Sequence, residues 1–182
     1  MSYKQVVRRI NGNHKSRQAG LKAKRNGDMF EARLDYACQW YRQNGVACIE
    51  KTPENIRRIR PLDKGQFVAV YSSDKSQVDY KGVYNGIGVA FEAKHFTGKS
   101  LPHARVKEHQ LAMLKDFARC GGKSYILASH EDEDIYRIPL ETWLRSIKYS
   151  GKKSVSLKDM DSYKVGTRGQ LIEFLLGIEE EE

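Results

Sequence analysis

The segment VDYKGVYNGIGVAFEAK, residues 78–94, constrains the fold more than any other part of the chain. Its central Asn85-Gly86 pair is a strong signal for a two-residue β-hairpin turn, because both central positions of a type I′ turn need a positive φ. With that turn, Tyr84 faces Ile87, and the register of every other opposed pair follows. The sequence therefore predicts both the hairpin and its register.

The hairpin brings three charged side chains together. Asp79 falls directly opposite Glu92, and opposed Cβ atoms of antiparallel strands lie roughly 4.5–5.5 Å apart. Lys94 follows Glu92 by two residues and projects from the same face. Facing carboxylates repel each other unless a cation neutralises them, and Mg²⁺ prefers such oxygen ligands. We therefore predict a phosphodiesterase metal site, with the Lys94 ammonium stabilising charge in the transition state or orienting the attacking water.

An exposed hairpin face is the alternative, with Glu92 and Lys94 as an ordinary surface ion pair. The apolar run 89–91 indicates a largely buried strand and favours the catalytic interpretation.

Two further polar residues lie on predicted helices. Gln110 falls on the apolar stripe of its helix, where a buried amide needs a partner, either the metal site or backbone. Glu31, three residues after Asp28, is either the far half of a capping box or a third carboxylate facing the hairpin.

Most of the excess positive charge lies at the N-terminus. The net charge is +9, and residues 1–27 contain eight basic residues and no acid. Such a segment is suited to binding phosphates of a nucleic acid, the alternatives being a solubilising tail or a membrane-surface segment. A long polar excursion, residues 51–77, adds further basic residues. The predicted DNA contacts are Arg8, Arg9, Lys22, Lys24, Arg25, Arg57, Arg58, Arg60 and Lys64.

Patterning along the chain predicts an α/β domain over residues 28–182, with a mixed sheet flanked by helices, after a flexible basic arm over 1–27. Neither a bilayer-spanning apolar run nor a signal-peptide core is found, so we expect a cytoplasmic protein. The predicted elements are a helix over 28–44 with Asp28 as N-cap, strands at Val46–Ile49, Ser124–Ser129 and Ile135–Ile138, an apolar stretch at Phe67–Tyr71, and helices over 103–120, 140–147 and 169–177.

At this level of detail the chain resembles the RecU-type Holliday-junction resolvases of bacteria and their phages. Four segments carry the resemblance, in the family's order: GDMFEARLDYACQWYRQNGVACIEKTP, VDYKGVYNGIGVAFEAK, SLPHARVKEHQ and GGKSYILAS. The family belongs to the PD-(D/E)xK nucleases, so the resemblance implies a restriction-endonuclease-like fold. It also implies a homodimeric, Mg²⁺-dependent endonuclease, with Mn²⁺ as a substitute, that resolves four-way DNA junctions.

The resemblance also assigns roles to residues. It implies that Asp79, Glu92 and Gln110 are metal ligands, that Lys94 stabilises the transition state, and that Glu31 is a supporting catalytic carboxylate.

The chain departs from the family at two places. Gln77 stands where the family has a threonine at the metal site, so its amide oxygen is a candidate ligand. The excursion over 51–77 replaces a longer stalk that enters the junction. Three alternatives therefore stay open: a less selective structure-specific or nicking endonuclease, a non-catalytic junction-binding protein, and an RNA-associated basic protein.

Overall fold

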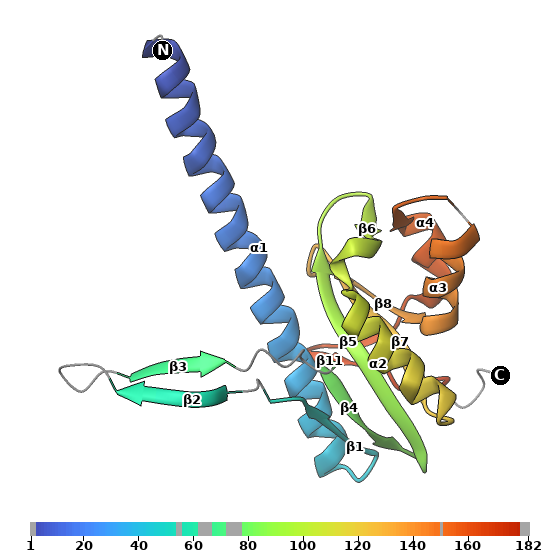
Figure 1. Ribbon diagram of the computed structural model, residues 1–182. Helices are drawn as coiled ribbons and strands as arrows, with labels where there is room; N and C mark the ends of the chain where they lie inside the picture. The colour runs from blue at the N-terminus through green and yellow to red at the C-terminus, as the bar shows by residue number, and fades with distance from the viewer. Residues whose placement is uncertain (1–2, 54–55, 62–66, 72–77, 150, 179–182) are drawn as a thin grey trace.

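The computed structural model describes residues 3–53, 56–61, 67–71, 78–149 and 151–178 (Figure 1). The side chains of residues 3–17, 19, 56–61, 67–71 and 149 lie outside this description. The helices are α1 (Tyr3–Gln43), α2 (Glu108–Arg119), α3 (Leu140–Tyr149) and α4 (Leu157–Met160), with 3₁₀ turns at His103–Arg105 and Asp161–Tyr163. The strands are β1 (Ala47–Lys51), β2 (Ile56–Pro61), β3 (Phe67–Tyr71), β4 (Tyr80–Tyr84), β5 (Ile87–Phe96), β6 (Ser100–Pro102), β7 (Lys123–His130), β8 (Asp134–Pro139), β9 (Ser154–Ser156), β10 (Thr167–Arg168) and β11 (Leu171–Ile172).

A five-stranded sheet in the order β1-β4-β5-β7-β8 forms the centre of the fold. Strands β5 and β7 run parallel, whereas the other neighbouring pairs are antiparallel. Parallel strands need a crossover connection, and α2 lies within it. The predicted α/β architecture with a mixed sheet is therefore confirmed.

Each face of this sheet carries its own hydrophobic core. Helix α1 and the segment around β11 cover one face, where Leu34 and Phe174 belong to the same cluster as Phe91. Helices α2 and α3 cover the other face, around Leu114 and Trp143. Strand β5 is therefore covered on both sides, as the continuous apolar run in its sequence predicted.

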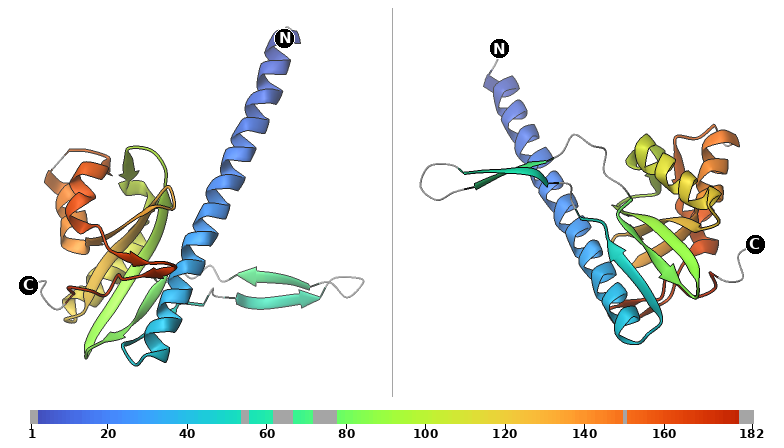
Figure 2. Two further views of the ribbon diagram at one scale, coloured as in Figure 1. Left: turned by 180° about the vertical axis from the view of Figure 1, so that it is seen from behind. Right: turned by 60° about the horizontal axis from the view of Figure 1, so that its bottom comes forward.

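Helix α1 begins at Tyr3 and crosses the boundary that the sequence suggested at residue 27. Its C-terminal half packs on the sheet, while its N-terminal half projects well beyond it (Figures 1 and 2). The predicted helix start at Asp28 is thus wrong. Gly27 is flanked by good helix formers, Leu21–Arg25 before it and Met29–Leu34 after it, and one glycine at this point costs only about 1 kcal/mol. Although α1 is long, it is polar, and among the described residues no helix has the length and apolar character needed to cross a membrane.

The excursion between β1 and β4 contains its own antiparallel pair, β2 and β3. The pair extends sideways from the sheet in every view (Figures 1 and 2). The predicted apolar stretch at Phe67–Tyr71 coincides with β3.

Two other predicted helices differ from the structure. The one over 103–120 begins only at Glu108, because Lys107 has the extended conformation of an N-cap (φ −75°, ψ 156°). The one over 169–177 is wrong, since β11 and turns occupy this region. Its buried residues Leu171, Phe174 and Leu175 do recur at helical spacing, but Leu171 and Ile172 pair with Arg168 and Thr167 in a short β-hairpin instead.

Candidate active site

The β4–β5 hairpin has the predicted turn and register. Asn85 and Gly86 have φ values of 47° and 78°, in the left-handed region that the turn requires. Tyr84 pairs with Ile87, and the ladder continues to Tyr80. Local turn chemistry therefore fixes which residues of the two strands meet.

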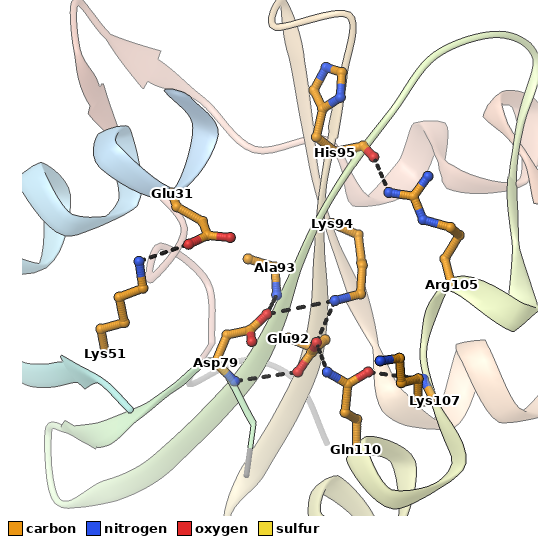
Figure 3. Close-up of polar contacts among 10 residues, drawn as sticks. All are labelled: Glu31, Lys51, Asp79, Glu92, Ala93, Lys94, His95, Arg105, Lys107 and Gln110. Carbon is orange, nitrogen blue, oxygen red and sulfur yellow. Dashed lines mark hydrogen bonds and ion pairs between the residues drawn. The ribbon is translucent and has the colours of Figure 1, made fainter. Parts of the chain in front are cut away.

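Asp79 and Glu92 lie side by side, as predicted (Figure 3). The backbone N–H of Asp79 donates to Glu92 Oε2 at 3.3 Å, and Asp79 Oδ2 accepts from the Ala93 N–H at 3.0 Å. The Glu92 side chain is completely buried, whereas that of Asp79 is 27% exposed. The two carboxylates thus belong to one site, with Glu92 buried at its base and Asp79 accessible to solvent.

Lys94 shares this site, which rules out the alternative of an exposed surface pair. Its Nζ contacts Glu92 Oε1 and lies 3.7 Å from Asp79 Oδ2, and the side chain is only 15% exposed. The predicted grouping of two carboxylates with one ammonium is therefore present.

The environment of Glu92 strongly disfavours its charge. Burial raises the pKa of this carboxyl from 4.5 to about 8, an effect that neighbouring Asp79 adds to and Lys94 opposes. A divalent cation beside both carboxylates would favour the ionised form. In the chemistry of its donor set, the site therefore fits a hard cation such as Mg²⁺.

Gln110 is buried beside Glu92, as its place on the apolar stripe suggested. Its Nε2 donates to Glu92 Oε1, while its Oε1 accepts from the backbone N–H of Lys107 at 2.9 Å and caps α2. The Lys107 N–H is a donor only, which fixes the orientation of the amide. Gln110 thus orients Glu92 here, and coordination of a metal by its oxygen requires the amide to turn.

Glu31 faces the same region from α1, but its direct partner is a lysine. Its Oε2 accepts from Lys51 Nζ at 2.7 Å, and Lys51 Nζ also lies 3.8 Å from Asp35 Oδ2. The hydroxyl of buried Tyr80 donates to Asp35 Oδ1 at 2.6 Å and contacts the backbone oxygen of Glu31 at 3.2 Å. Glu31 lies inside α1, so the capping-box alternative does not apply.

Sequence reasoning missed Lys51 and Asp35. The register β1–β4 places Lys51 opposite Tyr80, next to Asp79, but this pairing joins strands that are separated by the whole excursion. Only the helical spacing of Glu31 and Asp35, four residues apart, was visible as a signal.

Gln77 lies outside the described residues, so its predicted role as a ligand stays a prediction. Within the described ranges, no three His, Cys, Asp or Glu side chains are grouped so as to hold a metal ion. The donors at the hairpin are two carboxylates and one amide.

A polar cleft of about 830 Å³ lies between α1 and the carboxyl ends of β5 and β7. Lys22 and Arg25 line it from the helix, Thr97 from the end of β5, and Glu131 and Asp132 from the β7–β8 turn. Two of the predicted DNA contacts therefore lie on the α1 side of the sheet, near the strand that carries Glu92 and Lys94.

The other predicted DNA contacts are distributed over α1 and the excursion. Lys24 is exposed on α1. Arg8 and Arg9 belong to α1, and Arg57, Arg58 and Arg60 to the β2 region, all with side chains outside the description, while Lys64 lies outside the described residues.

Two acidic side chains and a lysine on one hairpin of a mixed sheet make the kind of site that metal-dependent nucleases use. The chain belongs to the RecU family, because the family model described as "RecU: Recombination protein U" matches residues 25–180. The family that the sequence motifs suggested is thereby confirmed.

Individual relatives agree with this assignment. The Holliday junction resolvase RecU of Mycoplasmopsis pulmonis (strain UAB CTIP) is 32% identical over 140 residues, which cover 75% of this chain and 82% of the relative. That of Bacillus pumilus (strain SAFR-032) is 31% identical over 143 residues, covering 74% and 69%. A solved structure of Archaeoglobus fulgidus Hjc, a Holliday junction resolvase, aligns with a TM-score of 0.48 and 12% identity over 75% of this chain and 88% of that chain.

Proposed function

We propose that this chain is a Mg²⁺-dependent endonuclease that resolves four-way DNA junctions. The observation that carries the proposal is the grouping of Asp79, Glu92 and Lys94 on one buried hairpin, in a chain of the RecU family. Relatives of that family are named Holliday junction resolvases.

Asp79 and Glu92 would hold the ion, with Gln110 orienting Glu92. When bound, Mg²⁺ or Mn²⁺ supplies positive charge at the scissile phosphate and lowers the pKa of the attacking water. The Ala93 N–H fixes the Asp79 carboxylate, and Gln110 together with Lys94 fixes that of Glu92. The Lys94 ammonium lies beside both carboxylates, where it would donate to a phosphate oxygen and stabilise the charge of the transition state.

DNA would be bound by the basic face of α1 and by the β2–β3 pair. Both elements project from the sheet, and both contain basic residues that the sequence predicted to contact DNA (Figures 1 and 2). Resolution of a junction needs two symmetric cuts, which a homodimer with a two-fold axis provides. In-line attack by water with departure of the 3′-oxygen, which takes up a proton, would leave 5′-phosphate and 3′-hydroxyl ends.

The test is cleavage of matched DNA substrates by the wild type and by Asp79→Asn. With Mg²⁺, we expect paired nicks in a four-way junction, little cutting of duplex, nicked or forked DNA, and loss of cleavage with retained junction binding in the variant. Equal cutting of duplex and junction would instead indicate a less selective nuclease. A wild type that binds junctions but never cuts would be a binding protein, and equal competition by RNA would indicate an RNA-associated protein.

A further inference from the structure

Lys51 forms a second lysine–carboxylate cluster beside the proposed metal site. Its Nζ bridges Glu31 and Asp35, at 2.7 Å and 3.8 Å. Lys94 bridges Glu92 and Asp79 in the same way, and Figure 3 shows these contacts together with the one between Lys51 and Glu31. Partial burial alone would lower the pKa of Lys51. The hydrogen bond and charge of Glu31, with the charges of Asp35 and Asp79, outweigh it and raise the pKa overall.

This second cluster is held in place by the sheet and by α1. Lys51 pairs with Tyr80 across β1 and β4. The next residue, Thr52, donates its backbone N–H to the backbone oxygen of Asp79 at 2.8 Å. The Tyr80 hydroxyl fixes Asp35 at 2.6 Å. The Lys51 ammonium is therefore built into the frame that also carries Asp79.

The charges of the two clusters leave room for one divalent ion. Four carboxylates face two ammonium groups, so the formal charge is −2, which a single Mg²⁺ neutralises. The carboxylates are Glu31, Asp35, Asp79 and Glu92, and the ammonium groups are Lys51 and Lys94.

Two-metal nucleases hold two ions roughly 3.5–4 Å apart, both by carboxylates. Here the carboxylates that a second ion would need, Glu31 and Asp35, already contact Lys51. We propose that the Lys51 ammonium is a built-in cation that takes the place of a second metal ion, so that each chain binds one divalent ion, at Asp79 and Glu92. This inference rests on the proposed metal site. It makes Lys51 a positioning residue, which keeps Glu31 out of the coordination of that ion.

The test is the number of Mn²⁺ ions bound per chain, measured by titration calorimetry of the full chain without DNA. We expect one ion for the wild type, for Lys51→Arg, which keeps the charge, and for Lys115→Met, which removes an exposed lysine on α2. Lys51→Met and Lys51→Gln are expected to bind two, because Glu31 and Asp35 are released. Adding Glu31→Gln to Lys51→Met should return the number to one.

Each outcome decides between the two proposals. Two ions in the wild type, or one ion in both neutral Lys51 variants, would overturn the role of Lys51 while leaving the metal site intact. No bound ion in the wild type would overturn the metal site itself, and this inference with it. Cleavage adds a second readout: the dependence of the rate on Mg²⁺ concentration should become steeper, near second order, in Lys51→Met.

Discussion

Glu92 is fully buried, yet it contacts Lys94, Gln110 and the backbone of Asp79. Desolvation is the largest cause of its pKa of about 8, so without a metal ion the carboxyl keeps its proton at neutral pH. Because the pKa of Glu92 stays raised despite Lys94, the ionised carboxylate needs a second cation beside it. The residue thus links the protonation of the site to metal binding, since ligand carboxyls must lose their protons.

The raised pKa of Glu92 predicts a stability that depends on pH. Above the unfolded value near 4.5, the unfolded chain is ionised while the folded carboxyl still holds its proton, so folding loses stability as the pH rises toward about 8. Glu92→Gln removes this effect. In EDTA, the unfolding temperature of Glu92→Gln minus that of the wild type should therefore increase from pH 5 to pH 8 and then level off. A difference that does not change with pH would contradict the pKa, whatever its sign.

At the scale of elements, the unbroken helix α1 has its own test. An added Cβ at Gly27 meets no atom within 4 Å, so Gly27→Ala should stabilise the helix by about 0.5–1 kcal/mol and raise helical ellipticity. The opposite is expected of Gly82→Ala, whose Cβ would lie 2.0 Å from the Cys48 oxygen on β1. Urea unfolding with circular dichroism measures both.

Asp28→Ala separates the observed helix from the one the sequence predicted. As an N-cap, Asp28 would contribute about 1 kcal/mol, whereas inside α1 its replacement by alanine should cost nothing. A clear loss of stability in this variant would restore the helix start at residue 28.

The elements that could be predicted from the sequence are those that local chemistry determines. Asn85-Gly86 determined the hairpin register, and with it the meeting of Asp79 and Glu92. The helix start was missed because Asp28 after Gly27 has the pattern of a helix N-cap, although good helix formers flank this pair on both sides. Long-range pairing was also missed: no local pattern shows that Lys51 lies beside Asp79.

At the scale of the whole molecule, positive charge follows α1 toward the candidate site. Lys22 and Arg25 line the cleft at the carboxyl ends of β5 and β7, and β5 also carries Glu92 and Lys94. α2 covers the other face of the sheet, where its Gln110 contacts Glu92, while its Lys115 lies further along the helix and lines a pocket with Glu141 and Arg145 of α3. A DNA strand bound along α1 would therefore reach the site from the side of Lys22 and Arg25.

This path predicts which lysines and arginines contribute to the salt dependence of DNA binding. Each phosphate contact releases counterions, so Lys22→Ala and Arg25→Ala should each lower the slope of log affinity against log salt by about 0.9. The affinity for a four-way junction is measured by fluorescence anisotropy in EDTA, which prevents cleavage, between about 50 and 200 mM salt. Lys115→Ala removes the same charge from the opposite face and should leave the slope unchanged. If all three variants lowered the slope equally, the effect would come from net charge alone, and the path along α1 would be wrong.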